Sequence, residues 1–218
     1  ARGMDGESIV MPKNGARFHF EMPGAVQGWQ VDYKNNLNPL TEINNSEGHS
    51  TEGERSLEIV YKNVSSGVNS IAYVDTFFPE EIKNLKGHAK KVFFHYNFIA
   101  CPMLYSGQIV KANIKADADN NKPIFCRLFI KFYGKQDELI TIDSEKQLIK
   151  PNNDVEFNWQ MDVEDGNPIA QLGVKIESDD IASGKVYIDY VSINGHPKTS
   201  FMRPSHVGLF QRGKPLKD

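Results

Sequence analysis

The chain has 218 residues, and its 25 basic and 28 acidic residues leave a net charge of −3. This length suits one large β domain with its own core, and the near balance of charge creates no field that would attract a polyanion. Nucleic-acid binding is therefore not expected. The apolar stretches fall far short of the roughly 20 residues that a helix needs to cross a bilayer, so no membrane span is predicted.

The predicted elements are strands, because apolar and polar residues alternate with a period of two almost throughout the chain. The first is the run at 18–21, which precedes Gly28 and Trp29. The polar stretch at 35–54 is predicted to be a surface loop, either an ordinary one or one that borders a ligand. A weak helical pattern occurs only at 79–85. Further strands are expected at residues 56–62, 70–78, 92–98, 111–117, 125–133, 139–143, 155–161, 169–177 and 186–193.

The alternation also predicts which side of each strand faces the core. In the strand at 125–133, the expected core side carries Cys126, Leu128, Ile130 and Phe132. In the strand at 111–117, it carries Ala112, Ile114 and Ala116. Trp159 is also assigned to the core, because it is in phase with its apolar neighbours. Trp29, beside Gly28 and ahead of Val31, is assigned to the core or to packing at the end of the sandwich.

The fold class predicted from this pattern is all-β, a jelly-roll β-sandwich. Eight or more strands separated by Gly, Pro, Asn and Asp clusters fit two packed sheets, whereas a βαβ fold would need helices between parallel strands. The sandwich domain is expected to cover residues 17–197. Residues 1–16 and 198–218 would then be extensions or linkers on either side of it.

Three short motifs resemble the galactose-binding-like jelly-roll domains, a group that includes carbohydrate-binding modules. Phe18-x-Phe20-Glu21 with Gly28-Trp29 resembles their opening strands, and Ser106-Gly107-Gln108 precedes a strand like their central one. Val186-Tyr187-Ile188-Asp189-x-Val191 is similar to their last strand. The resemblance covers roughly residues 18–197 and implies a domain that binds a ligand rather than one that catalyses a reaction.

A second resemblance concerns the end of the domain. Ile193-Asn194-Gly195-His196-Pro197, with Phe201-x-Arg203-Pro204 and Gly208, resembles the junction after the sandwich in bacterial multidomain proteins related to ADP-ribosylglycohydrolases. Their usual Trp-Arg-Arg continuation is replaced here by Phe210-Gln211-Arg212. The resemblance implies that this chain is one non-catalytic piece of a larger enzyme, ADP-ribosylglycohydrolase-related or another glycoside hydrolase. The family also implies a secreted, periplasmic or cell-surface protein.

The resemblance also points to a metal site. In many such jelly rolls a structural Ca²⁺ ion lies where the first and last strands meet, and the matching residues here are Glu21 and Asp189. Two carboxylates, supplemented by backbone carbonyls and water, can supply the six to eight oxygens that Ca²⁺ prefers. The alternative is a solvated carboxylate or an ion pair with Lys185. Asp117-x-Asp119-x-Asn121 opens like a calcium loop, but Lys122 at the sixth position favours a hairpin turn.

A carbohydrate site needs aromatic side chains for the apolar faces of sugars and polar groups for their hydroxyls. One face of the strand at 125–133 offers both kinds, and residues near 96 and 105 are expected to contribute from neighbouring segments. The alternative is that Phe129 is covered and that Arg127 forms a salt bridge. The predicted ligand-binding residues are Tyr96, Asn97, Tyr105, Arg127, Phe129, Lys131 and Tyr133.

Enzyme motifs are not found: the six histidines lack metal-binding spacing, and there is no G-x-S-x-G elbow or phosphate-binding Gly loop. The leading hypothesis is a non-catalytic module that binds a poly- or oligosaccharide beside a catalytic domain of the same polypeptide. The alternative is a structural sandwich that packs against that catalytic domain and binds no sugar. Cys101 and Cys126 are either two reduced thiols or one disulfide bridge.

Overall fold

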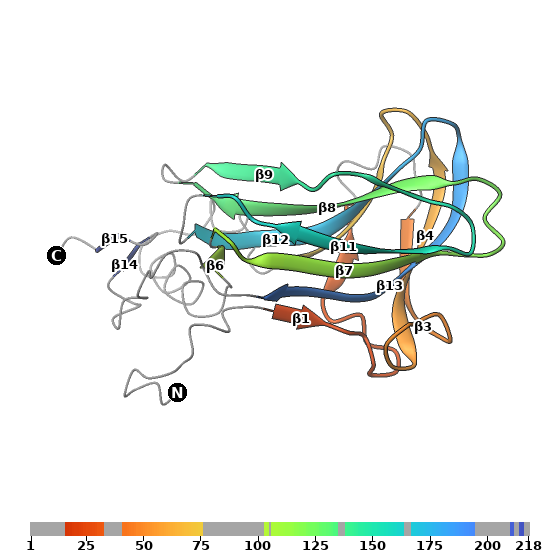
Figure 1. Ribbon diagram of the computed structural model, residues 1–218, viewed down its shortest axis with the longest axis horizontal. Helices are drawn as coiled ribbons and strands as arrows, with labels where there is room; N and C mark the ends of the chain where they lie inside the picture. The colour runs from red at the N-terminus through yellow and green to blue at the C-terminus, as the bar shows by residue number, and fades with distance from the viewer. Residues whose placement is uncertain are drawn as a thin grey trace.

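The computed structural model describes residues 16–32, 41–75, 103–104, 106–134, 138–163, 167–194, 210–211 and 214–215. Two antiparallel sheets face each other in this part of the chain, and none of its residues is in a helix (Figure 1). The all-β sandwich predicted from the sequence is therefore confirmed. Among the described residues, no helix is long and apolar enough to cross a membrane.

The first sheet has the strand order β11-β7-β13-β4-β3, and β1 also pairs with β13. In β1 and β13, Phe18 is opposite Val191, so the first strand pairs with the last long strand as the motifs predict. The strands of this sheet are β1 (Ala16–Phe18), β3 (Thr41–Glu47), β4 (Arg55–Val64), β7 (Ile109–Ala116), β11 (Asp154–Gln160) and β13 (Ala182–Asn194).

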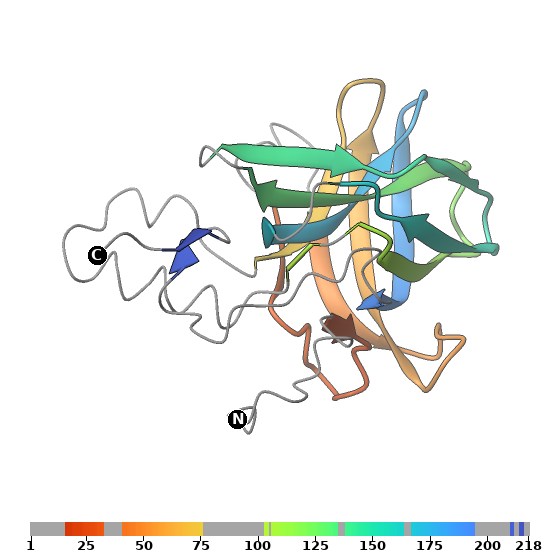
Figure 2. The same cartoon turned by 60° about the vertical axis from the view of Figure 1, so that its left-hand side comes forward.

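The second sheet has the strand order β10-β8-β12-β5-β2, with β9 beside β8 and β6 beside β12 (Figure 2). A separate two-stranded ribbon joins β14 (Phe210–Gln211) to β15 (Lys214–Pro215). The strands of the second sheet are β2 (Trp29–Val31), β5 (Ser70–Asp75), β6 (Met103–Leu104), β8 (Ile124–Tyr133), β9 (Leu139–Asp143), β10 (Gln147–Ile149) and β12 (Asn167–Glu177).

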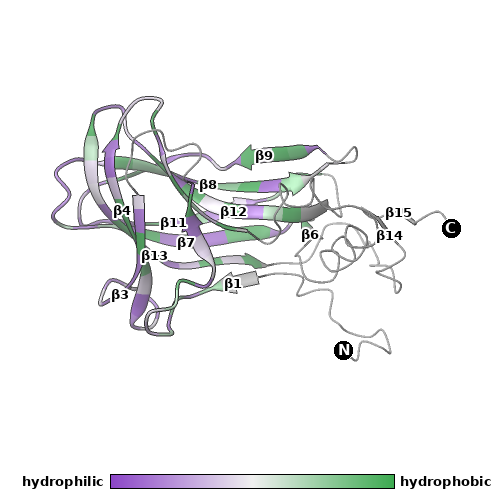
Figure 3. Cartoon of the chain, turned by 180° about the vertical axis from the view of Figure 1, so that it is seen from behind, coloured by the Kyte–Doolittle hydropathy of each residue, from purple (hydrophilic) through white to green (hydrophobic). Residues whose placement is uncertain are grey.

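The core lies between the two sheets and is built by the alternation seen in the sequence. Apolar and polar residues alternate along several strands in Figure 3. Trp29 is buried in the core, and Trp159 packs against it while remaining partly exposed. Cys126 is a free thiol whose pKa is raised by burial. The predicted core faces are confirmed, since the buried residues of β7 and β8 include Ala112, Ile114, Ala116, Cys126, Leu128, Ile130 and Phe132.

The prediction of a surface loop at 35–54 is wrong in its central part, because β3 forms there as the edge strand of the first sheet. Its polar residues are satisfied by tertiary hydrogen bonds that its own sequence does not reveal. The hydroxyl groups of Thr41 and Ser70 are hydrogen-bonded at 2.9 Å and link the two sheets. The Asn45 amide donates to the carbonyl oxygens of Phe20 and Ala25 at 2.7 and 2.9 Å.

Several predicted elements lie partly or wholly outside the described residues. These are the strand at 92–98, the helical pattern at 79–85, the end of the strand at 70–78 and Cys101. The boundaries of the domain at residues 17 and 197 stay a prediction.

Candidate functional site

Strand β13 changes neighbours at Asp189 and Tyr190, and this change creates a pocket. On one edge β13 pairs with β4 as far as Ile188 and with β1 from Val191 onward. On the other edge its register with β7 shifts between Ile188 and Tyr190, which marks a β-bulge at Asp189. A bulge adds one residue and redirects a side chain. Asp189 and Tyr190, which follow the core residue Ile188, can therefore both line a surface pocket.

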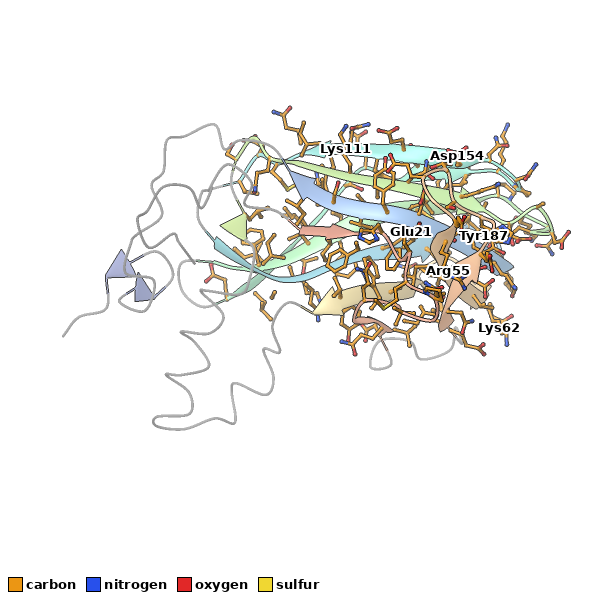
Figure 4. All side chains as sticks on the ribbon, turned by 90° about the horizontal axis from the view of Figure 1, so that it is seen from below. Glu21, Arg55, Lys62, Lys111, Asp154 and Tyr187 are labelled. Carbon is orange, nitrogen blue, oxygen red and sulfur yellow. The ribbon has the colours of Figure 1, made fainter. Side chains whose placement is uncertain are left out.

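The loop at 48–54, between β3 and β4, is held against this pocket by two carboxylates. Asp189 is only 2% exposed, and its Oδ2 accepts hydrogen bonds from the Thr51 amide at 2.8 Å, the Thr51 hydroxyl at 2.5 Å and the Glu52 amide at 2.8 Å. Glu21 accepts the Glu54 amide at 3.0 Å and the Arg55 amide at 3.3 Å. Figure 4 labels Glu21 and Arg55 on this side of the first sheet.

The two residues predicted to bind calcium are therefore brought to one pocket. It has a volume of about 310 Å³ and is lined by His19, Glu21, Glu52, Gly53, Asp189 and Tyr190. The alternative was an ion pair between Lys185 and one of these two carboxylates. Lys185 instead forms an ion pair with Glu58, at 3.2 Å. Among the residues that the structure describes, no group of three or more His, Cys, Asp or Glu side chains is placed to hold a metal.

Asp117 begins the turn that links β7 of the first sheet to β8 of the second, so the hairpin predicted here is wrong, because β7 and β8 belong to different sheets. Both carboxylate oxygens of Asp117 accept hydrogen bonds. The Tyr187 hydroxyl donates to Oδ2 at 2.5 Å and the Asp119 amide donates to Oδ1 at 2.8 Å. His49 stacks on the Tyr187 ring with the centroids 3.9 Å apart. Burial raises the pKa of Tyr187, and the hydrogen bond to Asp117 raises it further. Burial also acts to raise the pKa of Asp117, but the two hydrogen bonds, together with the nearby charges of His49 and Lys185, outweigh it and lower that pKa.

This arrangement predicts a pH-dependent contribution to stability. Because the pKa of Asp117 is lower in the folded protein, its charged form adds stability that is lost as the pH falls through the carboxyl range, below about pH 4. The variant Tyr187→Phe removes one donor and should melt below the wild type at pH 7. Thermal unfolding at several pH values should find this difference shrinking toward pH 3. A difference of equal size at both ends of the series would contradict the interpretation.

The outer face of the second sheet carries a row of residues across five strands. Phe129 of β8 is opposite Gly173 of β12 on one side and Asp143 of β9 on the other. Gly173 is in turn opposite Tyr73 of β5, which is opposite Gln30 of β2. The aromatic ring of Phe129 is thus next to a carboxylate on one side, and a phenol and an amide follow beyond Gly173 in the same row.

Two basic and two acidic side chains form ion pairs beside this row. The guanidinium of Arg127 contacts Glu177 at 2.9 and 3.0 Å and lies 3.8 Å from Asp143. The ammonium of Lys175 donates to both carboxylate oxygens of Asp143 at 2.6 and 2.8 Å. The salt bridge that was the alternative for Arg127 is therefore present, and the Phe129 side chain is only 2% exposed.

The structure places three of the seven predicted sugar-binding residues together. Arg127, Phe129 and Lys131 alternate along β8 and share its outer face. Tyr133 belongs to the same strand, opposite Leu139 of β9, but only its backbone is described. The other three, Tyr96, Asn97 and Tyr105, lie outside the described residues.

Sequence reasoning missed the residues that neighbouring strands add to this face. The order and register of β5, β9, β12 and β8 bring four such residues to the same face as Arg127 and Phe129, namely Tyr73, Asp143, Lys175 and Glu177. Alternation places Lys175 and Glu177 on one side of their strand, so a correct strand order would have found them.

Comparison with known proteins supports the fold. No family model matches the chain, and no curated protein does. Among solved structures, the chain is similar to the CBM22-1 xylan-binding domain of Xyn10C from Paenibacillus barcinonensis, with a TM-score of 0.54, 12% identity and coverage of 84% of this chain and 95% of that one. A carbohydrate-binding module of the CBM28 type, specific for non-crystalline cellulose, gives a TM-score of 0.54 at 12% identity, with coverage of 85% and 94%.

A third similar structure joins such a module to an enzyme. It contains the CBM22-1 and GH10 modules of the Clostridium thermocellum endo-1,4-beta-D-xylanase 10B, complexed with xylohexaose. The TM-score is 0.54 at 13% identity, and the match covers 83% of this chain and 28% of that one. At these identities the likeness concerns the fold, which is the jelly-roll β-sandwich of carbohydrate-binding modules.

Proposed function

We propose that this protein is a non-catalytic carbohydrate-binding module whose site is the outer face of the second sheet. The observation that carries the proposal is the row through Phe129, where an aromatic ring shares one face of the sheet with charged, phenol and amide side chains from several strands. Sugar rings offer an apolar C–H face and a rim of hydroxyls, so they need this combination. The expected ligand is a neutral polysaccharide, because the positive and negative side chains of this face pair with one another. They are Arg127, Lys175, Asp143 and Glu177.

The names of the similar structures support the same ligand class. Two of them carry xylan-binding domains or a bound xylohexaose, and another is specific for non-crystalline cellulose. Xylohexaose and cellohexaose are therefore the first probes for this chain. The fold alone does not decide the ligand, because one fold serves many functions.

We also propose that the module is tethered to a catalytic domain and acts outside the cytoplasm. One similar structure pairs its module with a GH10 catalytic module. Tethering raises the effective concentration of an enzyme at its substrate, so even a weak sugar site is useful. The competing hypothesis, a sandwich that only packs against its catalytic neighbour, predicts no affinity for either probe.

Replacing Arg127 with alanine tests the location of the site. Arg127 lies beside the Phe129 row, and losing a charged hydrogen-bond donor to a sugar should weaken binding roughly tenfold or more. Lys62→Ala is the matched control, since Lys62 is an exposed cation on β4 of the other sheet. Isothermal titration with xylohexaose and cellohexaose gives both affinities, and circular dichroism verifies that each variant is folded. Equal affinities for the two variants would place the site elsewhere.

We further propose that the pocket beside Asp189 holds a structural Ca²⁺ ion. Two carboxylate side chains, those of Glu21 and Asp189, line it, and backbone carbonyls and water would supply the remaining oxygens that Ca²⁺ prefers. The ion would link the loop at 48–54 to β13 and would balance the negative charge of the carboxylates.

Removal of metal tests this proposal. If Ca²⁺ is bound, EDTA should lower the melting temperature, added CaCl₂ should restore it, and elemental analysis should find about one calcium per chain. Glu21→Gln should lose the response to EDTA, whereas Glu42→Gln, on the exposed face of β3, should keep it. An unchanged melting temperature in EDTA, with no metal found by elemental analysis, would mean that the loop is held by hydrogen bonds alone.

A further inference from the structure

The Phe129 ring rests on a position that has no side chain. A Cβ atom at Gly173 would lie 2.4 Å from Cε1 of Phe129 and 2.5 Å from the carbonyl oxygen of Ala72. Real Cβ contacts are essentially never that short, so the ring occupies the space that any other residue at 173 would fill. Phe129 therefore lies against the bare backbone of β12 rather than standing out from the sheet.

An ion pair lies over the other side of this ring. The Lys175 ammonium is 5.3 Å from the ring centroid and donates to both oxygens of Asp143. Lys175 belongs to β12 and Asp143 to β9, and β8 with Phe129 runs between these two strands. The ion pair thus spans β8 above the ring, which explains how an aromatic residue on the outer face of a sheet is only 2% exposed.

The ion pair itself is partly accessible to solvent. The Lys175 and Asp143 side chains are 18% and 31% exposed, and ion pairs that water reaches contribute little to stability. Asp143 also has a second cation near it, because Arg127 lies 3.8 Å from its Oδ2. Separation of Lys175 from Asp143 therefore leaves the carboxylate beside Arg127, and the ammonium, which ends a flexible four-carbon side chain, can turn toward water, so the ion pair can open at small cost.

We propose that the Lys175–Asp143 ion pair is a displaceable cover over Phe129, and that a neutral sugar chain binds after displacing it. The opened pair exposes the ring to the C–H face of a pyranose and frees an ammonium and a carboxylate to bond its hydroxyls. This inference rests on the proposed carbohydrate-binding function and adds how the site is controlled. The apparent affinity for sugar is then lower than the intrinsic affinity, in proportion to the fraction of molecules in which the ring is exposed.

Solvent exposure of Phe129 tests the cover without any sugar. In hydroxyl-radical footprinting of the full chain, Asp143→Asn and Lys175→Met should each raise the oxidation of Phe129 severalfold over the wild type. Glu42→Gln is the matched control, because it removes the acid of the Lys62–Glu42 pair, 3.9 Å apart on the first sheet. Its Phe129 oxidation should equal that of the wild type. Equal protection of Phe129 in all four proteins would contradict the proposal that the ion pair covers the ring.

The salt dependence of binding supplies the second test. Salt weakens a solvent-accessible ion pair, so wild-type affinity for xylohexaose or cellohexaose should rise by about two- to fivefold between low and high NaCl. Asp143→Asn lacks the pair and should not respond. Affinity that falls with salt in the wild type would overturn the proposal. If Phe129 becomes accessible in the variants but no protein binds either probe, the cover stands and the proposed binding function is contradicted.

Discussion

Replacing Trp29 with alanine should lower the free energy of unfolding by about 3–5 kcal/mol, the usual cost of deleting a buried aromatic side chain. Trp29 is 3% exposed, and its ring meets those of Phe18 and Phe20 edge-on, with centroids 5.9 and 6.0 Å apart. These contacts join β2 of the second sheet to β1 and the segment that follows it. Urea denaturation of the variant and the wild type measures the loss.

Trp29→Phe is the matched variant, since it keeps an aromatic ring in the core and removes an indole nitrogen that has no hydrogen-bond partner. We expect it to recover more than half of the stability lost in Trp29→Ala. Neither variant should change sugar affinity while it is folded, because the indole is buried between the sheets. Loss of sugar binding by a folded Trp29→Phe protein would show that Trp29 belongs to the site.

Replacing Asp189 with alanine should cost about 2–3 kcal/mol in the free energy of unfolding. Its carboxylate is nearly fully buried and accepts three hydrogen bonds from Thr51 and Glu52, and bonds to a charged acceptor are worth more than neutral ones. The variant should also release the loop at 48–54. Hydrogen exchange at the amides of Thr51 and Glu52 should become faster, while exchange in β8 and β12 stays slow.

Thr51→Val is the companion variant for this interpretation. It removes only the hydroxyl that donates to Asp189 at 2.5 Å, and both backbone amides remain as donors. We expect a smaller loss than in Asp189→Ala, with the loop still protected. An Asp189→Ala protein as stable as the wild type, in calcium and in EDTA alike, would mean that the loop stays in place without this carboxylate.

Alternation along a strand was the most informative signal in the sequence. It predicted the buried side of β7 and β8 because each residue's direction there depends only on its own place in the strand. The motif around Asp189 likewise predicted that the last strand pairs with the first, as Phe18 opposite Val191 confirms.

Features that depend on other strands were not predictable in the same way. Strand β3 reads as a polar loop because Asn45 obtains its partners from Phe20 and Ala25, about twenty residues earlier in the chain. The burial of Phe129 depends on the missing side chain at Gly173 and on Lys175 reaching Asp143 across β8. Neither relation follows from the β8 sequence, so the sequence left open whether Phe129 is an exposed aromatic platform or a covered residue.

The measurement that tests the central claim most directly is a titration of the ¹⁵N-labelled chain with xylohexaose and cellohexaose, followed by NMR. The proposed function predicts saturable shifts of backbone amides in β8, β12 and β9, centred on Phe129, Gly173 and Asp143. Strands β11, β7 and β4 of the other sheet should remain unchanged. Saturable shifts confined to that other sheet would contradict the proposed site. The absence of shifts with either sugar would contradict the proposed function.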